Sequence, residues 1–471
     1  MDNEKLFAIV DSYKDDIIAT LRKWIAVPSV GAPRSADNAP FGPNVRKMLE
    51  TALEDASAMG FETHEFDGYA MDVSMGSGEK TMGMLCHLDV VPVGDGWTHD
   101  PWGGEIENGK LYGRGTADDK GAAVLALYAM KAVRESGIKL KDGVRLILGC
   151  DEESGMSDMA HYASVKKMPD YGFSPDADFP VINIEKGGMS IKLMAVSEGE
   201  ENAKYPIYEM YAGERQNVVP GKAMAVIGVK DEDAFKAEFE AVKKETGFDV
   251  SFTKLVNGRC MINTEGKSSH ASMPHLGKNA AGMLLIVLAK LNAGGGIRQA
   301  VKTLSEKIGM EYDGASLGLA CADEESGALT CNLGILRFDG KNLSINLDTR
   351  APMCADFPKL CGNAIMALAG SGIGYSLGGY RDTYHVDKNH KVVRGLIDAY
   401  TEATGTPGYA FAIGGGTYSR CMPNTVAFGP NFPGDVDMCH MPDEFMDIEK
   451  MMKSARIYAL AIAKLAGADE E

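Results

Sequence analysis

Residues 121–155 read GAAVLALYAMKAVRESGIKLKDGVRLILGCDEESG, and this stretch decides the fold. Residues 121–137 are typical of a helix, and residues 143–149 are typical of a buried strand. Another apolar strand, TMGMLCHLDVV at residues 81–91, comes before them. Because strand, helix and strand alternate, the pattern predicts an α/β fold with a mainly parallel sheet flanked by helices.

Acidic residues follow the second of these strands. Asp151, Glu152 and Glu153 leave the end of the strand, which is where function collects in parallel sheets. Consecutive side chains point in different directions, so one glutamate could bind a metal while the other faces a bound water. The same five letters, DEESG, return at residues 323–327 without a nearby histidine or aspartate motif. We interpret this second copy as a solvated loop that precedes a strand.

The sequence pattern changes twice along the chain. Residues 1–187 alternate helical and strand patterns and open with apolar residues at steps of three and four from Leu6 to Trp24, which predicts an amphipathic helix. Residues 188–384 contain strand patterns joined by Asn-Gly and Asp-Gly turns, which favour antiparallel pairing. Residues 385–471 return to the first pattern. We therefore predict a catalytic domain (1–187 and 385–471) interrupted by an α+β lid domain (188–384).

Composition excludes some classes of function. The 471 residues carry a formal charge of −18, which argues against binding to a nucleic-acid backbone. We find neither a signal-peptide pattern nor an apolar run of the roughly 18 residues that a membrane span needs. Nine cysteines without a CxxC spacing suit a reducing compartment. We expect a cytoplasmic protein without nucleic-acid or membrane partners.

The strand at residues 81–91 carries a possible metal ligand. His87 and Asp89 lie on the same side of it, because side chains alternate along a strand. A metal-bound imidazole needs its second ring nitrogen held, commonly by a carboxylate, so His-x-Asp supplies a ligand and its partner. Taken alone, His87 is more simply a structural histidine at a strand end.

A glycine-rich turn, GRGTADDKG at residues 113–121, contributes two aspartates. A phosphate-binding loop is the obvious alternative for such a turn. That motif requires serine or threonine after its lysine, whereas Gly121 and Ala122 follow Lys120 here. The turn therefore offers Asp118 and Asp119 as carboxylates near the start of the helix.

Two more segments complete the set of candidate ligands. SPDADFP contains Asp176 and Asp178, and DVDMCHMPDE contains His440. Each could be ordinary loop polarity. Taken together, five segments offer His, Asp, Glu, Asp and His, a mixture that suits zinc, manganese or cobalt better than calcium or magnesium. Five ligands fill two metal sites only if one carboxylate bridges them.

The ordered motifs HLDVVPVGDGW, LYGRGTADDKG, DEESG and SPDADFP, with the late His440, resemble the two-metal hydrolases of metallopeptidase family twenty. That family includes acetylornithine deacetylase, succinyl-diaminopimelate desuccinylase and carboxypeptidase G. The resemblance covers essentially the whole chain and is greatest to the bacterial Xaa-His dipeptidases (PepV type, carnosinase-like).

The resemblance implies two bound divalent cations, zinc first, with manganese or cobalt as alternatives. It implies that Asp118 bridges the cations and precedes Asp119 across a cis peptide. The remaining roles that it implies are His87 and Asp176 on one cation, Glu153 and His440 on the other, Asp89 orienting His87, and Glu152 as general base. Asp178 departs from the family, where glutamate is frequent, and this leaves open whether Asp178 contacts the substrate amino terminus.

The predicted lid contributes candidate substrate contacts. On its own, the segment SSHASMPHLGKNA is typical of a loop. The resemblance makes its His270 the group that stabilises the tetrahedral oxyanion, whereas we interpret His275, five residues later, as structural. Arg350 ends a strand, where it could bind a substrate carboxylate in bidentate fashion or pair with Asp348. The resemblance also implies substrate contacts from Asn217 and from the amide groups around Gly415.

The leading hypothesis is a dipeptidase that hydrolyses short peptides, Xaa-His or β-Ala-His among them. The alternative is an N-acyl amino-acid deacylase or desuccinylase, which uses the same metals and base but a different acyl pocket. A third hypothesis is a metal-binding relative without catalysis. Because the large insertion can mimic a partner's contribution, the resemblance also implies a monomer.

Overall fold

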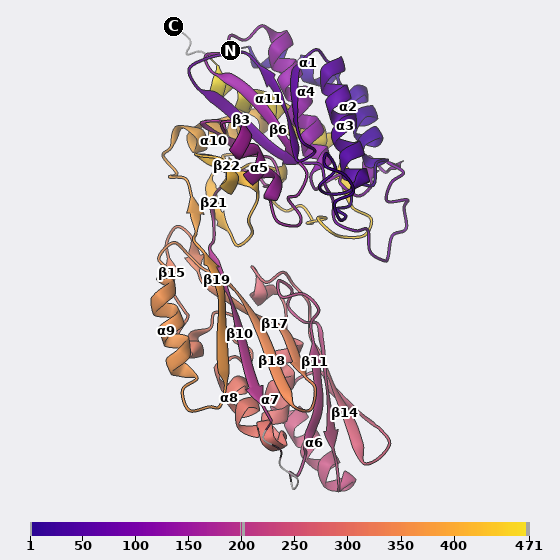
Figure 1. The fold of residues 1–471 in the computed structure, drawn as a ribbon, viewed down its shortest axis with the longest axis vertical. Coiled ribbons are helices and arrows are strands. Elements are labelled where there is room, and N and C mark those ends of the chain that lie inside the picture. Colours follow the sequence, from indigo (N-terminus) through magenta and orange to yellow (C-terminus); the bar gives the residue numbers. More distant parts are fainter. Residues whose placement is uncertain (1, 198, 200–202, 468–471) are drawn as a thin grey trace. The chain divides into compact units, whose positions relative to one another are not determined.

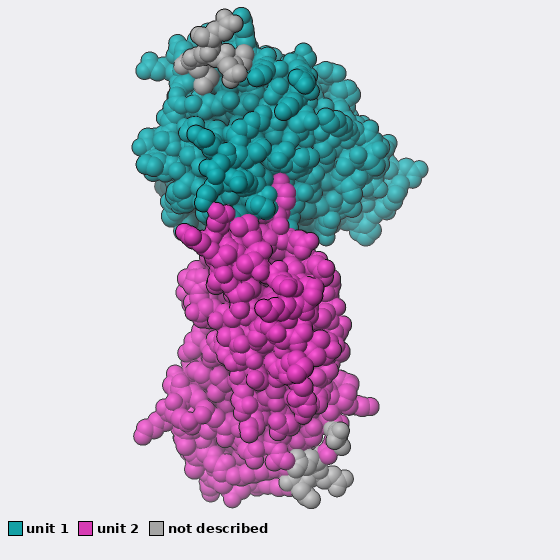
Figure 2. Space-filling model, turned by 90° about the vertical axis from the view of Figure 1, so that its left-hand side faces the viewer, with its two compact units in different colours: residues 1–184, 385–411, 416–471 teal, residues 185–384, 412–415 magenta. Residues whose placement is uncertain are grey.

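The computed structural model describes residues 2–197, 199 and 203–467, and the chain forms two compact units (Figure 2). Unit 1 comprises Met1–Ile184, His385–Phe411 and Gly416–Glu471. Unit 2 comprises Glu185–Tyr384 together with Ala412–Gly415. Each unit has its own central sheet (Figure 1).

A nine-stranded sheet carries the core of unit 1. Its strands are β1 (Glu62–Phe66), β2 (Ala70–Met75), β3 (Thr81–His87), β6 (Gly143–Gly149), β7 (Tyr171–Ser174), β9 (Val181–Glu185), β20 (Tyr384–His385), β21 (Ala410–Ile413) and β22 (Thr425–Ala427). The spatial order is β1-β2-β6-β3-β7-β22-β9-β20, and β21 pairs with β9. The centre, β6-β3-β7-β22, is parallel, whereas β1, β2 and β9 join it antiparallel. The predicted parallel sheet is confirmed for this centre, and the sheet as a whole is mixed.

The helices of unit 1 pack on this sheet and on one another. They are α1 (Asn3–Ser12), α2 (Lys14–Ile25), α3 (Pro43–Ala58), α4 (Lys120–Ser136), α5 (Ser157–Val165), α10 (Lys391–Thr404) and α11 (Ile448–Ala466). Helix α4 is the predicted helix of residues 121–137 and ends at Gly137 in the left-handed conformation (φ 81°). The helix is buried along almost its whole length, because α4 packs against α11, α1, α2 and β3.

The prediction of one continuous helix at the start of the chain is wrong, because two helices, α1 and α2, lie there. The helix breaks at Tyr13, whose N–H turns back to the carbonyls of Asp11 and Val10 instead of continuing the helix. Leu6 and Val10 before the break, and Ile17, Leu21 and Trp24 after it, are all buried. Because the buried residues keep the same spacing in both helices, the apolar pattern continues through Tyr13 and does not mark the break.

Short strands supplement the main sheet of unit 1. They are β4 (Ile106–Glu107), β5 (Lys110–Tyr112) and β24 (Phe445–Asp447) in one sheet, and β8 (Ala177–Asp178) and β23 (Pro430–Asn431) in another. Pairing of β24 with β5 joins the segment after His440 to the segment before Asp118. Pairing of β23 with β8 likewise ties the region after Asp176 to a late part of the chain.

Unit 2 is an antiparallel sheet backed by helices (Figure 1). In spatial order its strands are β13 (Val250–Lys254), β14 (Arg259–Glu265), β12 (Lys222–Gly228), β11 (Ile207–Ala212), β17 (Thr330–Phe338), β18 (Asn342–Arg350), β10 (Gly188–Val196) and β19 (Gly374–Arg381). Its helices are α6 (Glu232–Thr246), α7 (Ala280–Lys290), α8 (Arg298–Lys307) and α9 (Phe357–Ala367). The Asn-Gly and Asp-Gly turns join β13 to β14 and β17 to β18, so the predicted hairpins are confirmed.

The second DEESG copy is a small hairpin in unit 2. Strand β15 (Ala322–Asp323) pairs with β16 (Gly327–Ala328), and the remaining letters form the turn. Asp323 organises this turn, because its carboxylate accepts the N–H groups of Ser326 (2.6 Å), Glu325 (3.1 Å) and Cys354 (3.0 Å). Burial alone would raise the pKa of Asp323, but hydrogen bonds from Ser326 and Cys354 outweigh it and lower the pKa to about 2.

We expect Asp323→Ala to lower the stability of unit 2 by about 1–2 kcal/mol at neutral pH, because three amide groups lose their acceptor. Since folding lowers the pKa of Asp323, its contribution is present above the unfolded pKa of about 4 and is lost as pH falls through about 2. Denaturant unfolding of both proteins across this range measures the effect. Equal stabilities of the two proteins at pH 7 would contradict it.

The helices were compared with the length and apolar character that a membrane span needs. Among the described residues, no individual helix has the length and apolar character to cross a bilayer, and one bent pair, Ala280–Lys290 with Gly295–Lys307, passes only on combined length and composition. The nine cysteines, all within the described part of the chain, are free thiols.

Candidate metal centre

Two neighbouring parallel strands end beside each other in unit 1. His87 is the last residue of β3 and pairs in register with Gly149, the last residue of β6. The chain after β6 then supplies Glu152 and Glu153, whose N–H groups donate to the two carboxylate oxygens of Asp89, each at 3.2 Å. Asp89 thereby fixes the glutamates of the first DEESG copy next to His87.

The carboxylate of Asp118 lies between two imidazoles. Its Oδ1 is 2.9 Å from Nε2 of His87, and its Oδ2 is 3.1 Å from Nε2 of His440. Each imidazole has a second carboxylate close by, since Asp176 Oδ2 is 3.8 Å from His87 Nε2 and Glu153 Oε1 is 3.1 Å from His440 Nε2. The five side chains thus form the series Asp176, His87, Asp118, His440, Glu153, with Asp118 at its centre.

The surroundings hold His87 and Asp118 firmly. His87 is fully buried, and its Nδ1 lies 2.9 Å from the main-chain oxygen of Asp89, closer than the 3.5 Å to the Asp89 carboxylate. The peptide bond between Asp118 and Asp119 is cis, as the resemblance implies. The Asp119 carboxylate accepts the N–H of His87 at 3.1 Å, which ties the turn to the end of β3.

The electrostatics of these groups follow from their packing. Burial lowers the pKa of His87, but hydrogen bonds with Asp118 and Asp89 outweigh it and raise the pKa well above the usual value. Hydrogen bonds with Asp118 and Glu153 raise the pKa of His440 to about 10. A cation on these imidazoles competes with the proton, so metal binding releases protons and weakens as pH falls.

Glu152 has a different environment from Glu153. Burial raises the pKa of the Glu152 carboxyl to about 8; the charge of His87 opposes this shift, and the charges of Asp118 and Glu153 add to it. A bound cation would lower the pKa again by favouring the charged carboxylate. Glu152 is therefore a carboxyl that titrates away from its ordinary range beside the imidazole–carboxylate series.

Two groups of three residues could each hold an ion. Within each group, one donor atom from every residue lies within 4.8 Å of the other two. One group is His87, Asp118 and Glu153, and the other is His87, Glu152 and Asp176. The second group places Glu152 within ligand distance, although the resemblance makes it a base. The donor set of imidazoles and carboxylates fits zinc, manganese or cobalt, because these metals accept both ligand types.

Two residues that the sequence does not single out support this centre. The Asp158 carboxylate accepts the N–H groups of Cys150 (2.5 Å) and Asp151 (2.9 Å) and the hydroxyl of Tyr418. The Tyr418 ring meets the His87 ring edge-on, with centroids 6.1 Å apart. Asp158 is the second residue of α5 and comes three residues after the pentapeptide. Its place in the first helical turn was a usable signal, whereas Tyr418 carried none.

The candidate substrate residues lie together in unit 2. The N–H of Ala271 donates to the oxygen of Asn217 at 2.9 Å, and Val218 forms a β-bridge with His270. The Nδ1 of His270 lies 2.7 Å from Ser272 Oγ. A side chain at Gly414 would meet the Cβ of Ser272 at 2.5 Å, so the segment that contains Gly415 packs against the His270 segment.

Arg350 belongs to the same group of residues and has internal partners. Its Nε and Nη2 donate to the two carboxylate oxygens of Asp348 at 2.7 and 3.0 Å, and its Nη1 donates to the oxygen of Gly414 at 2.8 Å. The pairing with Asp348 that the sequence left open is therefore present. Among the described residues these bonds engage three of the five guanidinium N–H groups, so a role in substrate binding is compatible with the pairing.

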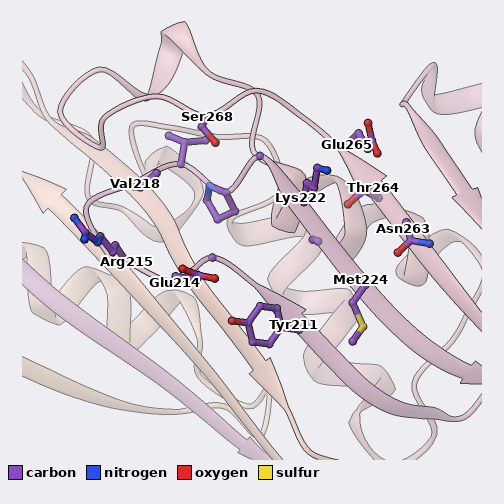
Figure 3. A pocket seen from close by; sticks show the side chains of 15 residues that line it. Tyr211, Glu214, Arg215, Val218, Lys222, Met224, Asn263, Thr264, Glu265 and Ser268 are labelled. Carbon is purple, nitrogen blue, oxygen red and sulfur yellow. The ribbon is translucent and has the colours of Figure 1, made fainter. Parts of the chain in front are cut away.

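A cavity of about 590 Å³ lies beside this group (Figure 3). It is lined by the ends of β11, β12 and β14, and side chains of both charges surround it, among them Glu214, Arg215, Lys222 and Glu265 (Figure 3). Within the described part of the chain, its lining includes Val218, the neighbour of Asn217, but neither Asn217 nor His270. This cavity is thus adjacent to the candidate substrate residues, and among the described residues none of the five candidate metal ligands lines it.

Comparisons with known proteins find relatives that match this chain over nearly its whole length. The Bacillus subtilis (strain 168) protein named "Putative dipeptidase YtjP" is 36% identical over 459 residues, which cover 96% of this chain and 98% of its own. Human carnosine dipeptidase 1 shares the fold with a TM-score of 0.60 at 13% identity, over 99% of both chains. The Saccharomyces cerevisiae di-peptidase Dug1p shares it with a TM-score of 0.58 at 14% identity, over 100% of this chain and 99% of its own.

A sheet with a parallel centre, beside which imidazoles and carboxylates gather, suits a metal-dependent hydrolase. The profile of Peptidase family M20/M25/M40 matches residues 83–464, a range that includes His87, Asp118, Glu153, Asp176 and His440. The chain belongs to this peptidase family and is a metallopeptidase.

Proposed function

We propose that this chain is a two-metal dipeptidase that hydrolyses the peptide bond of short peptides, mainly dipeptides, with Xaa-His and β-Ala-His among its candidate substrates. The observation that carries the proposal is the series of side chains centred on Asp118. In it, each imidazole lies between the Asp118 carboxylate and a second carboxylate, Asp176 or Glu153. The name of the B. subtilis relative, at 36% identity, supports dipeptides as the substrate class.

In this proposal His87 and Asp176 hold one cation, Glu153 and His440 hold the other, and Asp118 holds both. Cations in these positions would lower the pKa of a water molecule and polarise the scissile carbonyl. Zinc is the first candidate, with manganese or cobalt as alternatives.

Glu152 is the proposed general base. It accepts a proton from the attacking water and delivers it to the leaving amine, a role that needs a carboxyl able to hold a proton near neutral pH. Asp89 is a positioning residue in this proposal. Its carboxylate fixes the main chain of Glu152 and Glu153, and its main-chain oxygen lies against Nδ1 of His87.

Substrate binding is proposed for the group in unit 2. His270 would stabilise the tetrahedral oxyanion, and Asn217 would add a polar contact. Arg350 and the amide groups around Gly415 would bind the free α-carboxylate, because a guanidinium and main-chain N–H groups are the usual carboxylate donors. Such a carboxylate site favours very short peptides. A monomer remains our prediction, and sedimentation of the purified protein tests it.

A substrate panel separates this proposal from its alternative. Purified protein supplied with Zn²⁺ or Mn²⁺ is assayed on β-Ala-His, on simple dipeptides and on N-acetylated amino acids. We expect hydrolysis of dipeptides with kcat/KM above about 10⁴ M⁻¹s⁻¹ for a good substrate, the lower end of the usual enzyme range. Hydrolysis of only the N-acetylated compounds would establish a deacylase, and a metal-loaded protein inert on the whole panel would indicate a relative without catalysis.

A further inference from the structure

Glu444 is a fully buried carboxylate at the back of the metal centre. Its Oε1 accepts three main-chain N–H groups of the Asp118 turn: Gly115 at 3.0 Å, Ala117 at 2.8 Å and Asp118 itself at 3.2 Å. Its Oε2 accepts from Nη1 of Arg114 at 2.5 Å, and the Arg114 side chain is only 1% exposed. A single carboxylate thus binds three main-chain N–H groups of the turn and the Arg114 side chain.

Glu444 also belongs to the segment that carries the other imidazole. It follows His440 by four residues, and its main-chain oxygen accepts the N–H of Gly113 at 2.9 Å. Strand β24, which begins at the next residue, pairs with β5 immediately before the turn. Side chain and main chain of Glu444 therefore clamp the His440 segment onto the Asp118 turn.

We infer that Glu444, together with Arg114, is a positioning residue that sets the separation of Asp118 and His440 for metal binding. The inference rests on the proposed metal site. Asp118 and His440 come from segments more than 300 residues apart. Beside the contact of these two side chains with each other, the hydrogen bonds of Glu444 join the two segments next to the ligands. A residue that orients metal ligands without touching the metal contributes to affinity, typically by a factor of about 10 to 100.

The test compares Glu444→Gln with Asp72→Asn as a matched control. Asp72 is another fully buried carboxylate of unit 1, paired with Lys166 at 2.7 Å and with the Tyr162 hydroxyl at 2.7 Å, but it has no contact with the candidate ligands among the described residues. Both substitutions remove a buried charge and are expected to lower the Tm of the metal-free protein.

Affinity for Mn²⁺ and Zn²⁺ is measured by calorimetry on the metal-free proteins, so the result does not depend on the substrate or on dipeptidase activity. We expect Glu444→Gln to weaken binding of the cations about 10- to 100-fold, while Asp72→Asn binds them as the wild type does. At saturating metal, KM for a hydrolysed dipeptide should be unchanged in Glu444→Gln.

Equal metal affinities of wild type and Glu444→Gln would overturn the inference and leave Glu444 a structural residue. A loss of affinity in Asp72→Asn as large as that in Glu444→Gln would overturn it too, because the effect would then follow from lost stability. Arg114→Lys provides a second variant, in which we expect a weaker but same-signed loss, since lysine keeps the charge and loses the planar fork.

Discussion

Glu152→Gln is expected to lower kcat at least about 10³-fold, because removal of a general base costs typically 10²- to 10⁴-fold and nothing else nearby is proposed to replace it. The substitution keeps the size of the side chain and removes its capacity to accept a proton. Metal analysis of the same protein should still find two equivalents, since the five proposed ligands are untouched. Steady-state kinetics on a hydrolysed dipeptide, together with metal analysis, check both statements.

The metal content also decides between the two interpretations of Glu152. Because donor atoms of His87, Glu152 and Asp176 lie within ligand distance, Glu152 could hold a cation instead of a proton. Loss of one equivalent in Glu152→Gln would make Glu152 a ligand, and normal turnover would exclude it from the reaction. The matched control is Glu324→Gln, at the same place in the second DEESG copy, which should leave kcat and metal content unchanged.

Asp118→Ala should be as damaging, for a different reason. The series has one member shared by both imidazoles, and its removal takes a ligand from both proposed cations at once. Loss of the metals removes several kcal/mol of transition-state stabilisation, which corresponds to a decrease in kcat/KM of at least about 10³-fold. Bound metal should fall well below two equivalents, and added Mn²⁺ or Zn²⁺ should not restore full activity.

Asp178→Ala serves as the control for the metal content in this prediction, and it should still bind two equivalents. Asp178 is an exposed carboxylate of the same segment as Asp176, so its removal changes the local charge without removing a proposed ligand. Two bound equivalents in Asp118→Ala would show that Asp118 does not bridge, whatever the activity of that variant.

Local patterns predicted much of the fold. Apolar runs ending in polar residues located β3 and β6, and glycine marked the end of α4. The break at Tyr13 was hidden, because periodicity reports which face is buried and not whether the helix is continuous. The antiparallel outer strands were hidden as well, since pairing direction depends on contacts that no single strand encodes.

The candidate metal centre could be predicted in part, for a related reason. His87 ends a buried strand and Glu153 comes shortly after another, where a polar side chain is conspicuous, and the motif order singled out Asp118, Asp176 and His440 as further candidates. The supporting groups act across large sequence separations: 260 residues for Tyr418 with Asp158 and 330 for Arg114 with Glu444. Their roles arise only when the chain is folded, so no local pattern marks them.

The most direct test of the central claim is a metal titration of the chelator-treated protein, with bound metal and hydrolysis of a dipeptide measured on the same samples. The account predicts an inactive metal-free protein that binds two Mn²⁺ or Zn²⁺ per chain and reaches full activity only when both are bound. Full activity without metal would contradict the account, and so would saturation of both binding and activity at one equivalent.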